Sequence, residues 1–256
     1  MIFDTKELSN FLSAINKVET TKRPILVRVN GKQLSAAVIS GDRTINIFIT
    51  INGELETGES EIQESFAISD VSTMISSITS LGTKEKVVSI RWDTQRVQIS
   101  SATSTKMSKG ISLYLSQKTD QVMKSEGKSS IPDLGSYISI PLNSDVVEFL
   151  HKTLKISSSG FDRTTLGSDG KIEIGCNKMG KNTASCNVEV SNHGCTGEYF
   201  SRVVLANHMQ SVIAISKAFP DDNSQIRLYQ SVGQAISVVS SNFTLFFAVA
   251  QEDSFS

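Results

Sequence analysis

The sequence carries the same set of turn and helix signals twice. The turn signal Asn30-Gly31-Lys32 in the first half matches Asp169-Gly170-Lys171 in the second, and Ser69 and Asn207 each stand before a helical pattern as predicted caps. The two glycines are 139 residues apart, and the two predicted caps are 138 apart. Landmarks of two kinds that keep one spacing indicate an internal duplication, which constrains the fold more than any single segment does.

Hydrophobic periodicity assigns the first copy of the repeat. Leu8, Phe11, Leu12 and Ile15 follow the i, i+3, i+4, i+7 spacing of an amphipathic helix that Thr5 can cap. Alternating apolar residues and turn signals mark the strands. The later elements expected are strands Ile25–Val29, Leu34–Ile39, Ile45–Ile51 and Phe66–Ile68, a helix Asp70–Leu81, and strands Val87–Trp92, Arg96–Ser100 and Gly110–Leu115.

The second copy repeats that order after a polar segment. Ser116–Gly135 is rich in Gln, Lys, Ser and Gly, which is typical of a linker. We therefore predict an α+β protein with an N-terminal domain at 1–117, a connector at 118–136 and a C-terminal domain at 137–256. The elements expected after the connector are strand Ile138–Leu142, helix Ser144–Lys155, a strand from Ile156, strands Lys171–Asn177, Thr183–Val190 and Glu198–Leu205, helix His208–Phe219, and three strands ending at Ala250.

Composition excludes several classes of protein. The chain has 256 residues, 39% of them hydrophobic, and a formal net charge of −1, so no basic excess indicates nucleic acid or membrane binding. Neither a signal peptide nor a membrane-spanning apolar run is present, and we expect a cytoplasmic protein without a membrane partner. Cys176, Cys186 and Cys195 are odd in number and poorly spaced for a metal site, which favours reduced thiols.

No motif predicts catalysis. Gly175–Asn182 nearly matches a phosphate-binding loop, but Asn182 replaces the required Ser or Thr and strand patterns flank both sides, which favours a hairpin turn. His151, His193 and His208 share no metal-binding spacing. We therefore predict no catalytic site, no cofactor and no metal.

The polar faces of the four predicted helices are unusual because they are small, hydroxylated and charged mainly by lysine. A solvated surface is the plain alternative, and it stays open on the helices alone. The residues at or near the centres of these faces are Lys6, Asn10, Ser13 and Lys17 on the first helix, Thr73, Ser76 and Ser80 on the second, Lys152 and Lys155 on the third, and Gln210, Ala214 and Lys217 on the fourth.

Several short segments together resemble the DNA sliding clamps, which are polymerase processivity factors. Gly170-Lys171-Ile172-Glu173-Ile174 and Leu205-Ala206-Asn207-His208-Met209 are similar to segments of tailed-bacteriophage clamps. The ending Phe246-Phe247-Ala248-Val249-Ala250-Gln251-Glu252-Asp253 also resembles the last strand and acidic tail of the PCNA family. The order of elements and the chain length agree with this resemblance over nearly the whole chain.

The resemblance implies two duplicated clamp domains, with antiparallel sheets outside and helices lining a ring. It implies a homotrimer, or less favourably a dimer, that encircles duplex DNA without sequence preference and tethers a DNA polymerase. An ATP-driven clamp loader would be a further partner, and a phage-encoded protein would act in the host cytoplasm. The residues that would then face the DNA are Lys6, Asn10, Ser13, Lys17, Thr73, Ser76, Ser80, Lys152, Lys155, Gln210 and Lys217.

The second and third predicted helices depart from the family pattern. Asp145, Glu148 and Phe149 lie toward the polar side of the third helix, where the family prefers basic or small polar residues, and the second helix has no basic residue. The charge of the inner surface would therefore be modest. Isolated lysines among hydroxylated residues still suit a ring that must slide, because sequence-independent attraction to phosphates needs no fixed register.

Two further surfaces are expected. Strands with alternating apolar residues that lie at the edge of a sheet would expose unpaired backbone groups, so we predict that subunits join through these edges. The predicted interface residues are Ile111, Leu113, Leu115, Cys186, Val188 and Val190. A connector with few apolar residues should lie over the sheet and leave a groove for short peptides of a polymerase or loader. Its predicted lining is Val122, Met123, Ile131, Leu134, Leu245, Phe247, Val249 and Ala250.

One alternative from another class stays open. An α+β enzyme or ligand-binding protein could enclose a pocket between its duplicated sheets. Its weakness is the lack of any convergent acid, base, nucleophile or phosphate loop in the sequence.

Overall fold

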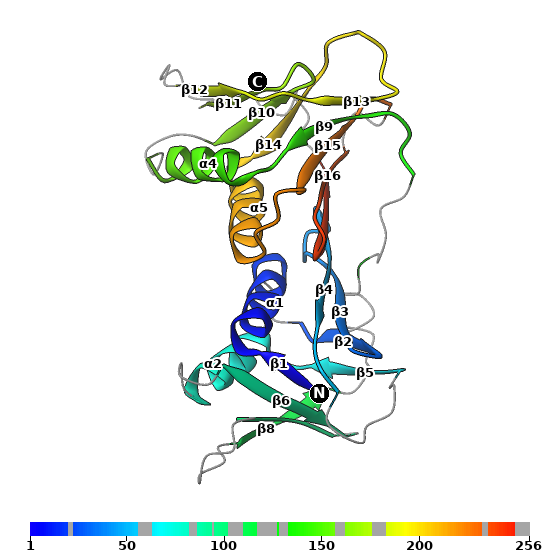
Figure 1. Ribbon diagram of the computed structural model, residues 1–256, viewed down its shortest axis with the longest axis vertical. Coiled ribbons are helices and arrows are strands. Elements are labelled where there is room, and N and C mark those ends of the chain that lie inside the picture. Colours follow the sequence, from blue (N-terminus) through cyan, green and yellow to red (C-terminus); the bar gives the residue numbers. More distant parts are fainter. Residues whose placement is uncertain are drawn as a thin grey trace. The chain divides into compact units, whose positions relative to one another are not determined.

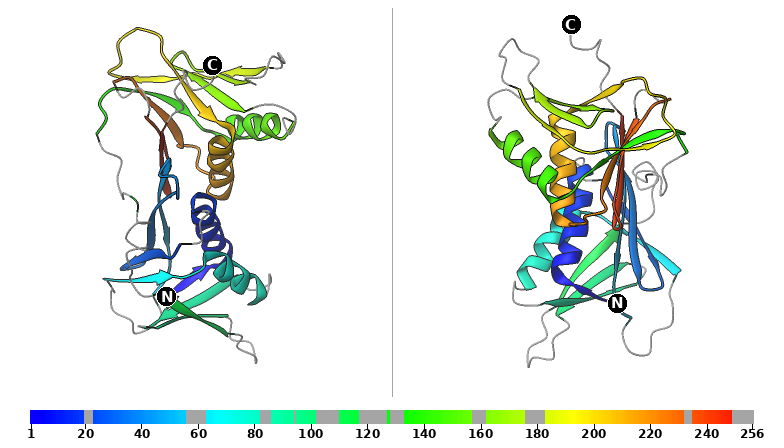
Figure 2. Two further views of the ribbon diagram at one scale, coloured as in Figure 1. Left: turned by 180° about the vertical axis from the view of Figure 1, so that it is seen from behind. Right: turned by 45° about the horizontal axis from the view of Figure 1, so that its top comes forward.

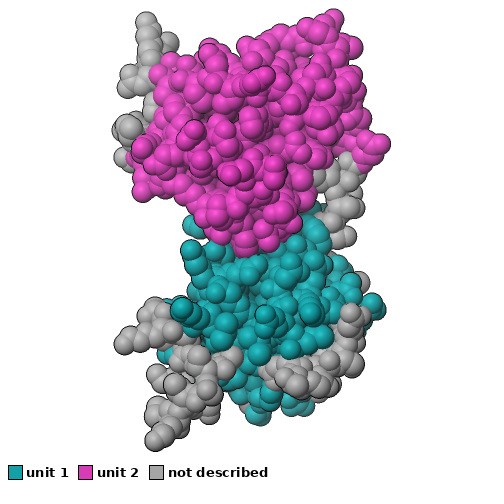
Figure 3. Space-filling view, in the orientation of Figure 1, with its two compact units in different colours: residues 1–129 teal, residues 130–256 magenta. Residues whose placement is uncertain are grey.

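A computed structural model gives the fold of each half of the chain. It describes residues 1–19, 23–55, 63–81, 86–93, 95–101, 110–116, 127, 133–156, 162–175, 183–231 and 235–248. The chain divides into two compact units, Met1–Ser129 and Ser130–Ser256 (Figure 3). The boundary between these units lies inside the segment 118–136.

The described residues of unit 1 form two helices and a set of antiparallel strands (Figure 1). Its strands are hydrogen-bonded in the order β1-β6-β7-β8-β5-β2-β3-β4. The helix α1 contacts α2 beside it and also packs on β3 and β4. The elements are β1 (Ile2–Asp4), α1 (Thr5–Val18), β2 (Ile25–Asn30), β3 (Gln33–Ile39), β4 (Ile45–Asn52), β5 (Gln63–Ile68), α2 (Val71–Leu81), β6 (Val87–Trp92), β7 (Arg96–Ser101) and β8 (Gly110–Ser116).

Unit 2 has two further helices, α4 and α5, which contact each other. Its strands form the orders β17-β16-β15-β9-β13 and β12-β11-β10-β14. The elements are β9 (Tyr137–Pro141), α4 (Ser144–Ile156), β10 (Arg163–Gly167), β11 (Lys171–Gly175), β12 (Ala184–Asn187), β13 (Ser191–His193), β14 (Ser201–Leu205), α5 (Ala206–Ala218), β15 (Gln225–Tyr229), β16 (Ala235–Val239) and β17 (Phe243–Ala248).

The strand pairings confirm the duplication. The set β1-β6-β7-β8 of unit 1 has the same connectivity as β9-β15-β16-β17 of unit 2, and β5-β2-β3-β4 has that of β14-β10-β11-β12. Both β2–β3 and β10–β11 are hairpins whose turn glycine has a positive φ, 58° at Gly31 and 86° at Gly170. The α+β class and the repeated domain are therefore as the sequence predicts.

Burial of one helix face explains why these elements hold together. The predicted stripe of α1 is fully buried, with Leu8, Phe11 and Ile15 each 0% exposed. On the strands, alternation sends one face to the core, as Ile47, Ile49 and Ile51 of β4 show. Each such aliphatic side chain contributes about 1.5–3 kcal/mol of burial free energy. The opposite face of each helix is left outside the core (Figure 2).

Several predicted helix caps are wrong. The cap of α1 is Asp4 rather than Thr5, because the Asp4 carboxylate accepts hydrogen bonds from the backbone N–H groups of the first turn. For the same reason Asp70 replaces Ser69 at α2, where its Oδ1 accepts from the N–H of Ser72 at 2.9 Å. A carboxylate is favoured there by both the free N–H groups and the helix dipole. The predicted cap Asn207 lies inside α5, whose N-cap Leu205 makes no side-chain capping bond.

Several predicted strand boundaries are also wrong. Ile156 ends α4, and the next strand begins at Arg163. The strand predicted to reach Val190 ends at Asn187, although the N–H of Val188 still donates to the carbonyl of Gly170 at 3.0 Å. The last three strands are confirmed through Ala248, although the predicted end at Ala250 lies outside the described residues. The strand expected from Glu198 begins only at Ser201, and β1 and β13 were not predicted.

Asp221 joins two loops of unit 2. Its carboxylate accepts from the backbone N–H of Ser241 at 2.8 Å and of Asn223 at 2.9 Å, and from the Ser240 hydroxyl at 3.0 Å. These donors lower the pKa of Asp221 from 3.8 to about 2, with the N–H of Ser241 as the largest cause. The carboxylate therefore connects the turn before β15 to the turn between β16 and β17.

We predict that Asp221→Asn lowers the free energy of unfolding by about 1–2 kcal/mol at neutral pH, a value discounted for solvent screening. Because the folded-state pKa is depressed, this contribution is complete above the unfolded pKa and disappears as pH falls toward 2. Denaturant unfolding across this pH range measures it. Asp222→Asn, at the exposed neighbouring residue, is the control and should change little. An equal loss in both variants, or a loss that persists at pH 2, would contradict this assignment.

Candidate nucleic-acid interface

The outward face of α1 carries two exposed lysines. Lys6 and Lys17 are exposed, while Asn10 and Ser13 between them are half-buried. Neither lysine makes an ion pair within the part of the chain that the structure describes. Asn16, which sequence reasoning did not select, lies near this face, and its side-chain oxygen accepts a 3.3 Å hydrogen bond from Ser72 of α2.

The outward face of α2 is neutral and hydroxylated. Thr73, Ser76 and Ser80 are exposed, as predicted for the centre of this face. Their hydroxyl donors are already used within the helix or at its cap. The bonds run from Thr73 to Asp70 Oδ2 at 2.9 Å, from Ser76 to the Ser72 carbonyl at 2.9 Å, and from Ser80 to the Ser77 carbonyl at 2.8 Å. This face therefore presents few free donors to an anion.

In unit 2, a carboxylate connects the lysines of the two helices. Glu148 of α4 contacts Lys152 one turn later at 3.2 Å and Lys217 of α5 at 3.3 Å. Hydrogen bonds from Lys152 and then Lys217 lower the pKa of Glu148, so it is ionised at neutral pH. Lys155 is exposed and makes no ion pair within the described ranges. In the sequence, Glu148 stands out only as a departure from the family pattern.

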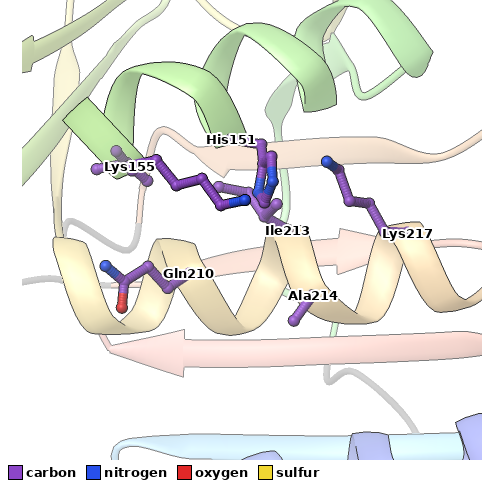
Figure 4. Close-up of a pocket in the computed structure, with 7 residues that line it drawn as sticks. His151, Lys155, Gln210, Ile213, Ala214 and Lys217 are labelled. Carbon is purple, nitrogen blue, oxygen red and sulfur yellow. The ribbon is translucent and has the colours of Figure 1, made fainter. Parts of the chain in front are cut away.

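A groove of about 260 Å³ lies between α4 and α5. Figure 4 shows Lys155 reaching toward His151 from α4, with Lys217 on the other side and Gln210 and Ala214 on α5. Partial desolvation lowers the pKa of His151, and the nearby ammonium groups of Lys217 and Lys155 lower it further. The imidazole is therefore neutral at pH 7, and the positive charge of the groove comes from its lysines.

Neither a candidate metal-binding group nor a membrane-spanning helix occurs in the described ranges. No group of three or more His, Cys, Asp or Glu side chains there is arranged to hold a metal ion. None of the helices formed by those residues has the length and apolar character needed to cross a lipid bilayer. Cys186 and Cys195 are free thiols whose pKa is raised by burial, and Cys176 lies outside the described residues.

Comparison with known proteins identifies the fold. No protein-family model and no curated protein matches the sequence. The proliferating cellular nuclear antigen of Entamoeba histolytica superposes with a TM-score of 0.72 at 12% identity, over 98% of both chains. The DNA polymerase III subunit beta of Pseudomonas aeruginosa gives 0.64 at 12% identity, over 98% of this chain and 64% of that one.

The chain has the DNA sliding clamp fold. The fold implied by the family resemblance is thereby confirmed. At 12% identity the likeness concerns the fold alone, so the roles of individual residues have to be argued from their surroundings.

Two strands of this clamp fold have an open side. Among the described residues, β8 is paired over Gly110–Tyr114 with β7 alone, and it meets β5 only at Leu115 and Ser116. The second such strand is β12, whose single strand neighbour in the described chain is β11. The predicted interface residues Ile111, Leu113 and Cys186 are half-buried on these strands, and the side chain of Leu115 lies outside the description.

Val188 and Val190 lie beyond β12 but next to it. Both side chains are half-buried. A Cβ at Gly170 would lie 2.0 Å from the carbonyl oxygen of Val188, so only glycine allows this close approach. The absence of a side chain at Gly170 therefore allows Val188, directly after β12, to pack against the β10–β11 turn.

The predicted partner groove is only partly described. Leu245 and Phe247 are each 1% exposed and belong to the core, which corrects their place in an exposed groove. Leu134 is half-buried, and its carbonyl accepts from Ser231 at 2.9 Å. Val122, Met123, Ile131, Val249 and Ala250 lie outside the described residues.

One connector residue is fixed to unit 1. The N–H of Gly127 donates to the carbonyl of Ala37 at 2.9 Å, and a Cβ at Gly127 would lie 1.9 Å from Asn46 Oδ1. The connector therefore passes directly over β3 and β4 at this point. This close approach was not foreseen from the sequence, although an isolated glycine in a linker is the signal that could have indicated it.

Proposed function

We propose that this chain is a DNA sliding clamp, a ring that encloses duplex DNA and tethers a DNA polymerase without catalysing a reaction. The observation that carries the proposal is the duplicated clamp fold with a helix pair in each unit whose outward faces are lysine-bearing or neutral. The two solved structures with a similar fold are a proliferating cellular nuclear antigen and a subunit of a DNA polymerase, which supports a role in DNA replication.

The chemistry of the helix faces suits sliding better than fixed binding. Lysines attract phosphates without reading bases, so the attraction is independent of sequence. On α2 the hydroxyl donors are satisfied internally, which removes directional bonds that would favour one register on DNA. A formal net charge of −1 is compatible with this role, because persistence on DNA would come from enclosure rather than from many strong contacts.

The open strands supply a way to close a ring. We propose that β8 of one subunit pairs with β12 of the next, because each has backbone groups on one side without a strand neighbour in the described chain. Such a contact is heterologous, and it closes into a ring when the rotation between copies allows it. A homotrimer is the assembly proposed, with a dimer as the less favoured outcome.

The proposed partners follow from the same role. A DNA polymerase and an ATP-driven clamp loader would bind through short apolar peptides near the connector, where Gly127 lies against Ala37 and Leu134 is half-buried. The pocket-enzyme alternative has less support, because the α4–α5 groove places lysines around a neutral His151 without a catalytic carboxylate bonded to it.

The interface prediction concerns charge on an open strand. We expect Leu113→Asp and Val188→Asp each to convert the assembled chain into monomers, because a carboxylate would be desolvated where the edges join. The solution mass from sedimentation measures this. Gln98→Glu is the control, since Gln98 is exposed on β7 between two paired strands. If both edge variants keep the parent's mass, subunits do not join through these strands.

The DNA prediction concerns the three lysines on helices α1 and α4 that make no ion pair within the described chain. Replacing Lys6, Lys17 and Lys155 with Ala should weaken duplex binding and reduce the slope of log K against log salt by about 0.9 for each phosphate that is no longer neutralised. Anisotropy of a fluorescent duplex titrated at several salt concentrations measures both quantities. Lys32→Ala, an exposed residue in the β2–β3 turn, is the control. Unchanged affinity and slope in the triple variant would refute a DNA-facing role for these helices.

A further inference from the structure

Glu148 occupies an unusual place among the proposed DNA-facing lysines. One carboxylate oxygen, Oε1, is 3.2 Å from Lys152 Nζ, and the other, Oε2, is 3.3 Å from Lys217 Nζ. A single acidic side chain of α4 thus contacts ammonium groups on both helices of the pair. Each carboxylate oxygen contacts one ammonium group. Two oxygens of a phosphate group could contact the same two lysines in its place.

These ion pairs contribute little to the stability of the fold. The side chains of Lys152, Glu148 and Lys217 are 70%, 49% and 36% exposed. Exposed pairs of this kind add almost nothing to the free energy of unfolding, because water and salt screen them. The contacts are therefore better explained by their effect on what the two lysines offer to an incoming anion.

We infer that Glu148 competes with the phosphates of a duplex for Lys152 and Lys217, and so limits how tightly α4 and α5 hold DNA. The inference rests on the proposed function. A phosphate can reach either ammonium group only by displacing the carboxylate or by approaching within about 10 Å of its negative charge, a distance over which salt does not fully screen repulsion.

The charge of the helix pair supports this competition. The helices α4 and α5 carry three lysines against the two carboxylates of Asp145 and Glu148, so lysines exceed carboxylates by one. The hydrogen bonds from the two lysines lower the pKa of Glu148 and so keep it ionised at neutral pH. In unit 1, by contrast, Lys6 and Lys17 have no carboxylate in an ion pair within the described ranges.

The competition can be isolated by comparing two carboxylates of one helix. Asp145 is exposed on α4 two turns before Lys152 and has no ion pair in the described chain, so Asp145→Asn changes the net charge as Glu148→Gln does. Binding of the full chain to a fluorescent duplex is measured over a range of salt. Glu148→Gln should bind several-fold tighter, with a salt slope steeper by about one to two as extra phosphate contacts form. Asp145→Asn should show a smaller gain and the parent's slope.

A second background tests whether the effect passes through the two lysines. In a Lys152→Gln/Lys217→Gln chain, Glu148→Gln should no longer tighten binding, because the groups it competes for are absent. Equal gains from Glu148→Gln and Asp145→Asn, or an unchanged gain in the double-lysine background, would overturn the inference. A parent chain that binds no duplex at any salt concentration would instead contradict the proposed function itself. Thermal unfolding of each variant confirms that the fold is retained.

Discussion

The structure depends on paired amphipathic helices that bury one face and leave the other outside the core. In unit 1 the stripe of Leu8, Phe11 and Ile15 fixes α1 against the strands and against α2. Its remaining face carries Lys6 and Lys17, which are exposed outside the core and can contact something else. The same division applies to α4 and α5 in unit 2, because the strand connectivity around them is repeated.

The chemistry of those free faces sets the strength of any contact with DNA. On α2, hydroxyl groups donate to carbonyls of their own helix, and on α4 and α5 a carboxylate occupies two of three lysines. Each feature weakens directional or electrostatic attraction to phosphate. Under the proposed function, weak attraction is an advantage, because a ring that grips one register cannot move along the duplex.

The fold was predictable from the sequence because its signals are periodic and repeated. The alternation in β4 and the helical stripe of α1 give the element types, and the matched turns at Gly31 and Gly170 give the duplication. Boundaries were less predictable, since they depend on single side-chain contacts, such as those by which the Asp4 carboxylate rather than Thr5 caps α1. The three-residue strands β1 and β13 are too short for any periodic pattern to show.

The candidate site was predictable in part for a similar reason. Helical periodicity placed Lys6, Lys17 and Lys155 on exposed faces, as the structure shows. Periodicity could not show that Glu148 reaches Lys217, because that contact joins residues on separate helices. The connector argument placed Phe247 in a groove although its side chain is in the core, since an apolar strand residue can point to either face.

The central claim is that the chain holds DNA by enclosing it, and the most direct test uses the topology of the DNA. The chain is loaded onto a circular duplex, unbound chain is removed, and the circle is cut once at constant ionic strength. Enclosure predicts that the chain stays with the intact circle and leaves after the cut, because a ring can slide off a free end. Equal retention on cut and intact DNA would contradict the account.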